Sequence, residues 1–276
     1  MSESNTERTQ SKVFGEVAEL YHAVRPDYPD GLYNWMIETS SVNGHDLLLD
    51  IGCGTGKSSA PFLRRGFTVL GVEPDSMMAR VALRELGDLD TFSIEQLPLD
   101  ELRTIPSQAS LVYAGQSWHW MNPETRFESV ASLLNPDGWL CVFWNRPEQT
   151  QQSFDTEMDA LYDELAPSLN AGSSKIRLPG LKAAIAADSP KDEFDLSGLF
   201  EPVHTYEESW EKVMSSDEHV QSLMTQSDHR MLPEKSRIEL FSRVQELIDN
   251  DGGRYKQRFT THAYAARLSV LSLIHI

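Results

Sequence analysis

An apolar run that leads straight into three alternate glycines constrains this chain more than any other feature. The run is 47–51, and the glycines are Gly52, Gly54 and Gly56. An apolar segment of this length bounded by glycine is typical of a buried parallel strand. Closely spaced glycines let backbone N–H groups approach a ligand at the start of a following helix. The pattern therefore predicts a strand, a tight turn and a helix that together hold a nucleotide-like molecule.

A second apolar strand, 67–73, ends in the carboxylate of Glu73. An acidic residue about twenty positions after such a turn is where ribose hydroxyls are bound in doubly wound folds. The next helix is predicted to start at Asp75 or Ser76, because either side chain can accept a backbone N–H bond as an N-cap. The glycine spacing is GxGxG, whereas dinucleotide-binding proteins have GxGxxG.

Two segments resemble motifs I and II of class I S-adenosylmethionine-dependent methyltransferases: Asp-Ile-Gly-Cys-Gly-Thr-Gly at 50–56 and Gly-Val-Glu-Pro-Asp at 71–75. More narrowly, the chain is similar to the type 11 branch, which acts on small molecules. The resemblance spans roughly residues 14–268. Three further segments carry it: Tyr21-x-x-x-Arg25-Pro26-x-Tyr28-Pro29, Glu95-Gln96-Leu97-Pro98 and Gly115-Gln116-Ser117-Trp118-His119-Trp120.

The resemblance implies a site for S-adenosyl-L-methionine, which leaves as S-adenosyl-L-homocysteine. Tyr21 and Arg25 would pack over the mouth of that site, and Ile94 and Glu95 would hold the face and edge of adenine. Asp50 would orient the glycine turn through its backbone N–H groups or contact the methionine portion. The full predicted cofactor-binding set is Tyr21, Arg25, Asp50, Gly52, Gly54, Glu73, Ile94, Glu95 and Gln116.

The aromatic turn after the fourth predicted strand is expected to face the transferred methyl group. Trp118 and Trp120 are expected to line an apolar acceptor pocket and to interact with the sulfonium cation. His119 is the one group there that can take a proton near neutral pH, although a histidine beside aromatic rings is more often a structural anchor. Arg146, after the fifth strand, joins Arg25 as a candidate clamp for an acceptor carboxylate.

Strands that alternate with helices predict an α/β fold with a Rossmann-like, parallel, doubly wound sheet. The resemblance implies the rest of the topology: a seven-stranded, mostly parallel sheet with one antiparallel strand and a helical cap insertion. A turn is predicted at 135–138, and a loop at 168–198. The predicted organisation is a disordered N-terminus at 1–11, a methyltransferase domain at 12–268 and a tail at 269–276. Within the domain we expect N-terminal helices at 12–45, a cofactor-binding core at 46–145, a cap at 146–250 that includes one strand, and a final strand at 251–268.

The charge balance argues against a nucleic-acid partner. The chain has 42 Asp and Glu against 24 Lys and Arg, which gives a formal net charge of -18 that would repel a phosphate backbone. The two cysteines offer no disulfide framework or metal spacing, and no apolar run approaches the length of a membrane span. We therefore expect a cytoplasmic protein with a small-molecule acceptor and no membrane or nucleic-acid partner, and the oligomeric state is left open.

Several reaction types are disfavoured by the residues. Cys53 has no neighbouring Lys or His in the sequence to stabilise a thiolate, and Lys57 lacks the GxxxxGK[ST] spacing of a phosphate loop. No [DN]PP[FY] motif follows the fourth strand, which argues against base and glutamine N-methylation. No acidic ligand pair follows it either, so we expect no metal.

These features together predict methyl transfer from S-adenosylmethionine to an oxygen or nitrogen of a small molecule, which includes a carboxylate as one option. Two alternatives remain open at this point. One is a nicotinamide-dependent oxidoreductase, which shares the logic of strand, glycine turn and helix. The other is a non-catalytic protein that keeps the S-adenosylmethionine site.

Overall fold

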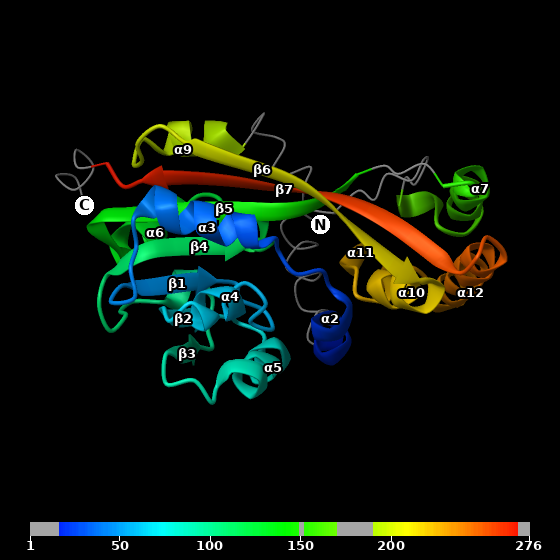
Figure 1. Cartoon of the computed structure of the whole chain (residues 1–276), viewed down its shortest axis with the longest axis horizontal. Coiled ribbons are helices and arrows are strands. Elements are labelled where there is room, and N and C mark those ends of the chain that lie inside the picture. The colour runs from blue at the N-terminus through cyan, green and yellow to red at the C-terminus, as the bar shows by residue number, and fades with distance from the viewer. Residues whose placement is uncertain (1–16, 149–151, 170–189, 270–276) are drawn as a thin grey trace. The chain divides into compact units, whose positions relative to one another are not determined.

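The computed structural model describes residues 17–148, 152–169 and 190–269 (Figure 1). The predictions for 1–11 and for nearly all of the tail at 269–276 lie outside these residues. The chain divides into two compact units, which we describe separately. The sheet unit comprises 27–145, 190–208 and 261–269, and the helical unit comprises 17–26, 146–148, 152–169 and 209–260.

Seven strands form one sheet in the order β3-β2-β1-β4-β5-β7-β6. Neighbours among the first five strands in this order are parallel, and β7 runs antiparallel (Figure 1). The predicted seven-stranded α/β fold with one antiparallel strand is therefore confirmed. The strands are β1 (Leu47–Ile51), β2 (Thr68–Val72), β3 (Phe92–Glu95), β4 (Ala109–Gly115), β5 (Leu134–Glu148), β6 (His204–Ser215) and β7 (Arg254–Arg267).

The helices of the sheet unit follow its strands along the chain. They are α3 (Asp30–Ser40), α4 (Ala60–Arg64), α5 (Ser76–Leu86), η2 (Leu99–Glu101), η3 (Trp118–Trp120), α6 (Arg126–Leu133) and α9 (Pro190–Ser197). Helix α5 begins as the sequence indicates, because the side chain of Asp75 accepts the backbone N–H groups of Met77 and Met78 at 2.8 and 3.0 Å.

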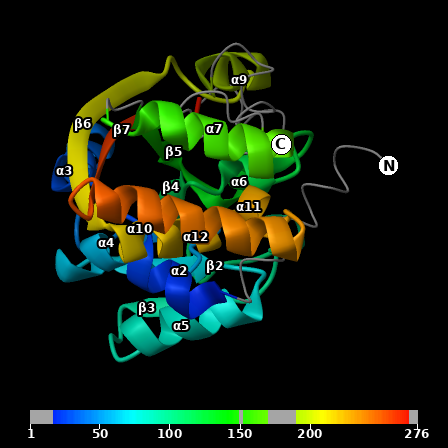
Figure 2. The ribbon, with the colours of Figure 1, turned by 90° about the vertical axis from the view of Figure 1, so that its right-hand side faces the viewer.

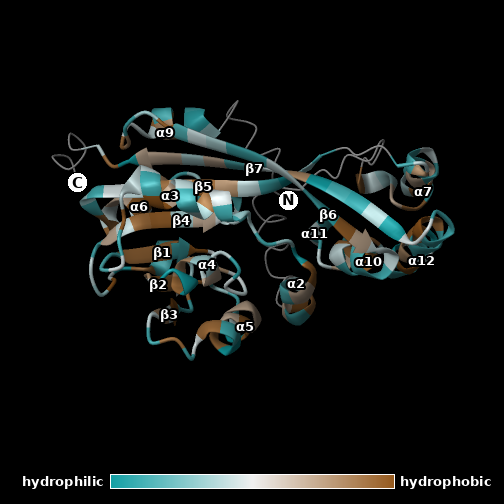
Figure 3. Cartoon of the chain, in the orientation of Figure 1, coloured by the Kyte–Doolittle hydropathy of each residue, from teal (hydrophilic) through white to brown (hydrophobic). Residues whose placement is uncertain are grey.

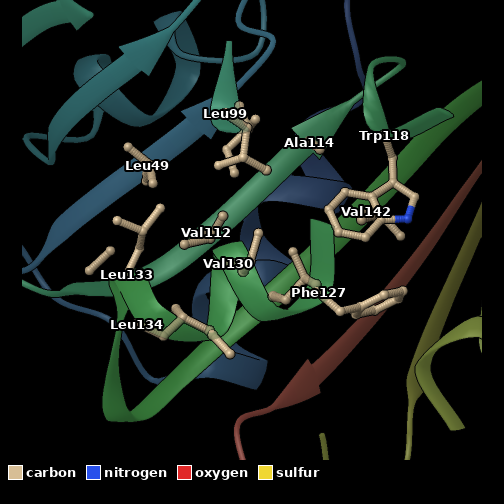
Figure 4. Packing of buried hydrophobic residues seen from close by; sticks show 14 of the residues in the cluster. Leu49, Leu99, Val112, Ala114, Trp118, Phe127, Val130, Leu133, Leu134 and Val142 are labelled. Carbon is tan, nitrogen blue, oxygen red and sulfur yellow. The ribbon is translucent and has the colours of Figure 1, made fainter. Parts of the chain in front are cut away.

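Each central strand buries side chains on both faces of the sheet. Val112 and Ala114 of β4 point into a cluster with Phe127 and Val130 of α6, as Figure 4 shows. Leu111 and Tyr113 point to the opposite face, into a second cluster that includes residues of α3 and α4. Alternation of this kind, with both sets buried, is expected of a sheet covered by helices on both sides. In Figure 3, β1 is accordingly hydrophobic along most of its length, whereas β6 is largely hydrophilic.

The helical unit has its own apolar core. It contains α2 (Ala18–Val24), α7 (Asp155–Leu165), η4 (Pro167–Leu169), α10 (Ser216–Met224), α11 (Ser227–Arg230) and α12 (Glu234–Asn250). Figure 2 shows α12 between α7 and α10, and Leu161, Leu223 and Val244 from these three helices share the core. Over the described residues, every helix is too short or too polar to cross a bilayer.

The predicted helix after the glycine turn is present, although it begins only at Ala60 and is five residues long. Two local predictions were wrong. The predicted turn at 135–138 lies inside β5, where the pairing with β4 shifts between Ala109 and Leu111, so the extra residues are accommodated as an irregularity of the ladder. Part of the predicted loop at 168–198 is the helix α9, which Phe194 anchors in the same core as α6.

Candidate active site

The turn after β1 is closed against the end of β2. The amides of Gly52 and Cys53 both donate to the carbonyl of Val72, at 2.7 and 3.2 Å. Gly52 has φ +68°, and a Cβ placed on it would lie 2.5 Å from Cβ of Ser117. A side chain at this position would therefore meet both backbone strain and a clash. The Ser117 hydroxyl donates to the carbonyl of Ile51 at 2.6 Å, which ties the turn after β4 to the same place.

The carboxylate of Glu73 lies beside this turn, as the spacing predicts. Its Oε2 accepts the amide of Gly54 and its Oε1 accepts the amide of Asp75, both at 2.9 Å. The residue is only 8% exposed, and burial raises the pKa of its carboxyl to about 7. Each carboxylate oxygen has two lone pairs, so one on each oxygen remains for a ligand.

Asp50 is fully buried between β2 and β4, opposite Gly71 and Tyr113 in the strand register. Its Oδ2 accepts the hydroxyls of Ser58 and Ser59 at 2.6 and 2.7 Å. The carboxylate thus holds the turn through two hydroxyls and not through backbone N–H groups, which was one of its two expected roles; the other, a contact with the methionine portion of the cofactor, stays a prediction. Burial raises the pKa of Asp50 to about 6, and Oδ1 has no hydrogen-bond partner among the described residues.

Ile94 and Glu95 lie next to Glu73 because β3 pairs with β2. Ile94 is opposite Gly71, and the Glu95 carbonyl accepts the amide of Glu73 at 3.0 Å. Ile94 is half-buried, and a Cβ on Gly71 would lie 3.4 Å from its Cγ1, whereas the Glu95 side chain is exposed. The structure therefore brings together the turn, Glu73 and the two residues proposed for adenine.

Gln116 is held at the end of β4 in an unusual backbone conformation, with φ +58°. Its amide nitrogen Nε2 donates to the carbonyl of Asn145 at 3.2 Å. Asn145 itself, 3% exposed, donates to the carbonyl of Asp27 at 3.1 Å and accepts the hydroxyl of Thr261 at 2.7 Å. Asn145, which connects the end of β4 to Asp27 and Thr261, was not among the predicted site residues. Its position directly after the apolar residues of a strand is a sequence signal that could have identified it.

The prediction that Trp118 lines an acceptor pocket was wrong. Its ring is 1% exposed and packs edge-to-face against Phe127, at 5.1 Å between ring centroids (Figure 4). Its Nε1 donates to Oε2 of Glu193 at 3.2 Å. The cause is α9, whose Phe194 also reaches this core. Trp120, by contrast, stays half-buried, with its ring centroid 4.6 Å from that of His119.

His119 has surroundings that weaken it as a base. Nε1 of Trp144 donates to its Nδ1, at 3.4 Å. Burial and the nearby charge of Arg126 lower the pKa of its imidazole to about 4. The ring is consequently neutral near pH 7 and binds a proton only weakly.

The matches to known proteins agree with this arrangement. Residues 49–142 match a family model described as a methyltransferase domain. An uncharacterized methyltransferase of Mycobacterium tuberculosis is 30% identical over 144 residues, 51% of this chain and 56% of that protein. A Saccharomyces cerevisiae protein provisionally named an S-adenosylmethionine-dependent methyltransferase is 34% identical over 131 residues, 45% of this chain and 43% of that protein.

This chain carries a methyltransferase domain. The predicted family is confirmed over the segment that holds β1, β2 and Glu73. The chain spans about half the length of the curated relatives that it matches.

Solved structures extend the likeness of the fold beyond residues 49–142. One from Anaeromyxobacter dehalogenans, provisionally named a type II methyltransferase, has a TM-score of 0.58 at 19% identity and covers 89% of this chain and 98% of that chain. A phosphoethanolamine N-methyltransferase of Haemonchus contortus, with phosphomonomethylethanolamine and S-adenosylhomocysteine bound, has a TM-score of 0.51 at 12% identity and covers 97% of this chain and 60% of that chain. At these identities the likeness shows the fold alone.

Three predicted site residues belong to the helical unit, and their roles at the methyltransferase domain stay predictions. Nε of Arg25 donates to the hydroxyl of Thr225 at 2.9 Å and its NH2 group donates to the Thr225 carbonyl at 3.0 Å. The same guanidinium lies 5.1 Å from the ring centroid of Tyr21. Nε of Arg146 is buried without a hydrogen-bond partner among the described residues.

The surroundings of Cys53 and Lys57, the two residues disfavoured as reactive groups, agree with that prediction. Cys53 is buried, and burial with the charges of Asp50 and Glu73 holds the pKa of its thiol well above the usual value, which disfavours a thiolate. Nζ of Lys57 pairs with Oδ1 of Asp27 at 2.8 Å.

Proposed function

We propose that this protein transfers the methyl group of S-adenosylmethionine to an oxygen or nitrogen of a small molecule. The observation that carries the proposal is the carboxylate of Glu73, which the Gly54 amide holds beside the glycine turn with one lone pair free on each oxygen. Two vicinal ribose hydroxyls can donate to these two oxygens. The half-buried Ile94 offers an apolar surface to an adenine ring on the adjacent strand.

The charge of the site favours this cofactor over a nicotinamide dinucleotide. Asp50 and Glu73 are both buried carboxylates, and the charge of Asp50 contributes to the raised pKa of Glu73. A ligand with a sulfonium and an ammonium group relieves this repulsion, whereas a pyrophosphate adds to it. The helix after the turn is also only five residues long, so it offers little dipole to a phosphate.

Methyl transfer from S-adenosylmethionine requires little acid–base catalysis by the protein. S-adenosylmethionine supplies a methyl group that is already activated by the positively charged sulfur. The residues of the chain have to bind both partners, align the nucleophile with the methyl group and exclude water. Alignment of this kind can lower a barrier by about 7–11 kcal/mol. Ser58, Ser59 and Ser117 contribute rigidity, since their hydroxyls fix the turn from two sides.

On the acceptor side, a carboxylate is one nucleophile that needs no proton removed. Arg146 is our candidate for a cation that binds it, because its buried Nε has no partner among the described residues. Arg25 is a weaker candidate, since two of its nitrogens already donate to Thr225. A cytoplasmic location and the absence of a metal remain part of the proposal.

Two experiments test the proposal in sequence. The purified chain is titrated by calorimetry with S-adenosylmethionine, S-adenosylhomocysteine and NADH; binding of NADH alone would identify an oxidoreductase and overturn the proposal. A metabolite extract is then incubated with the protein and methyl-labelled S-adenosylmethionine. Labelled products identified by mass spectrometry would establish catalysis and the acceptor, whereas binding without product would indicate a non-catalytic S-adenosylmethionine-binding protein.

A further inference from the structure

We propose that the surroundings of His119 hold its ring as a neutral hydrogen-bond donor, whose Nε2–H binds an oxygen atom of a ligand in the methyl-transfer reaction. The identity of the ligand rests on the proposed function, but the state of the ring does not. That state is set by the neighbours of the two ring nitrogens and by the charges that lie near the ring.

Trp144 fixes the tautomer of His119. The indole Nε1 of tryptophan is a donor only, so the Nδ1 atom it reaches must present a lone pair. In a neutral imidazole the other nitrogen then carries the hydrogen. Trp144 is itself 1% exposed in the core of the sheet unit, which leaves its indole little freedom to turn away. The tautomer is therefore imposed by a rigid neighbour.

Arg126 keeps the ring from charging. It lies at the start of α6, where its NH1 group donates to the carbonyl of Trp118 at 3.0 Å and its guanidinium lies 4.8 Å from the Trp118 ring centroid. Its positive charge adds to the burial of His119 in disfavouring an imidazolium. Both effects have the same sign, so the ring stays neutral at physiological pH.

Glu193 of α9 positions Arg126. The carboxylate accepts NH2 of Arg126 at 2.7 Å, and the Glu193 and Arg126 side chains are 12% and 8% exposed. The same Oε2 atom accepts Nε1 of Trp118. An ion pair buried to this degree is costly to break from one side, because the remaining charge is left without a partner. Glu193 thus fixes the peptide next to His119 from a helix 67 residues further along the chain than Arg126.

The Nε2–H group is the remaining polar group of the ring. Among the residues that the structure describes, no hydrogen bond reaches it, and the ring is half-buried beside Trp120. In this tautomer Nε2 carries the hydrogen and has no lone pair to take a proton, while the lone pair of Nδ1 accepts the indole N–H of Trp144, so we infer that His119 does not act as the base. It can donate to an oxygen, and either the cofactor carboxylate or the methyl acceptor can supply that oxygen.

The state of the ring is tested first, on the protein without ligand. Nitrogen-15 NMR should show Nε2 protonated and Nδ1 unprotonated in neutral His119. R126Q should raise the pKa of His119 toward 6.5, while R126K, which keeps the charge, and E128Q, on the exposed side of α6, should leave it near that of the wild type. Circular dichroism checks that each variant is folded. A protonated Nδ1, or a pKa that R126Q does not move, would overturn the inference.

The role of Nε2–H as a hydrogen-bond donor is tested by replacing His119 with each of the two amide side chains. The terminal nitrogen of glutamine lies near the position of Nε2, and that of asparagine lies near the position of Nδ1, so H119Q keeps the donor and H119N loses it. Binding of S-adenosylhomocysteine is measured by calorimetry, and labelled methyl transfer into a metabolite extract is measured separately.

A loss of affinity of about tenfold in H119N but not H119Q would assign the oxygen to the cofactor. If both variants bind S-adenosylhomocysteine equally well but H119N alone loses methyl transfer by about tenfold, the oxygen belongs to the acceptor. If H119Q and H119N behave alike in both assays, the inference is wrong. If no variant and no wild-type protein binds S-adenosylhomocysteine, the proposed function fails while the NMR result on the ring still stands.

Discussion

The amide of Gly54 lies 2.9 Å from Oε2 of Glu73, nineteen residues further along the chain. This bond joins the turn after β1 to the end of β2. The backbone that would face a ligand and the carboxylate that would bind it are therefore fixed together, so a change at either one should alter ligand binding.

Replacing Glu73 should weaken cofactor binding. E73A removes both acceptors proposed for the ribose hydroxyls, and hydrogen bonds to a charged group contribute about 1.5–3 kcal/mol each. We expect the affinity for S-adenosylhomocysteine, measured by calorimetry, to fall by at least about tenfold. The control is E101Q, an exposed carboxylate of η2, which should bind like the wild type.

Cofactor affinity should depend on pH through the same residue. Burial raises the pKa of Glu73 to about 7, so at pH 6 most of the carboxyl is protonated and has lost an acceptor oxygen. Affinity for S-adenosylhomocysteine should rise by about tenfold from pH 6 to 8 and then level off. E73Q should bind weakly with a flat profile; an unchanged slope in E73Q would attribute the pH dependence to another group.

Asp50 should make the folded state less stable as pH rises. Its pKa is raised from 3.8 to about 6, so the folded state binds the proton more tightly than the unfolded state does. The stabilising contribution of the proton is therefore full below about pH 4 and is lost as pH rises through 6, by roughly 3 kcal/mol. The free energy of unfolding, measured in urea at a series of pH values, should therefore fall less between pH 4 and pH 7 in D50N than in the wild type.

Trp118 should behave as a core residue. W118A removes a ring that is 1% exposed, and truncation of a buried aromatic side chain typically costs about 3–5 kcal/mol of unfolding free energy. W120A, which truncates a half-buried ring two residues on, should cost clearly less in the same denaturant titration. Equal costs would contradict the placement of Trp118 in the core.

Gly52 should tolerate no side chain. Its φ is +68°, and a Cβ added there would lie 2.5 Å from Cβ of Ser117, so G52A should destabilise the fold by about 1–3 kcal/mol from backbone strain alone. G44A is the control, since the nearest atom to its Cβ would be 3.7 Å away. A shift of the urea midpoint in G44A as large as in G52A would argue against this cause.

The parts of the site that the sequence predicts are those with short-range signals. Gly52, Gly54 and Glu73 come from two adjoining units of strand and helix, and parallel pairing of β1 with β2 brings them together without help from distant segments. The N-cap at Asp75 is likewise local. The alternation of strands and helices predicts the parallel, doubly wound sheet, whereas its seven strands with one antiparallel strand were expected from the family resemblance.

The residue that was assigned wrongly, Trp118, and the residue that was missed, Asn145, both have contacts with residues far along the chain. Trp118 is buried because Glu193 and Phe194 come from α9, a helix that lies in a stretch without clear periodicity. Asn145 acquires its role from Asp27 and Thr261, which no spacing rule connects. Tertiary partners of this kind are invisible in local propensity.

The most direct test of the central claim is a crystal structure of the protein with S-adenosylhomocysteine. We predict both ribose hydroxyls within about 3 Å of the Glu73 carboxylate, with the Gly54 amide still bonded to it. A bound ligand whose ribose lies elsewhere, or a Glu73 side chain turned toward solvent, would contradict this claim.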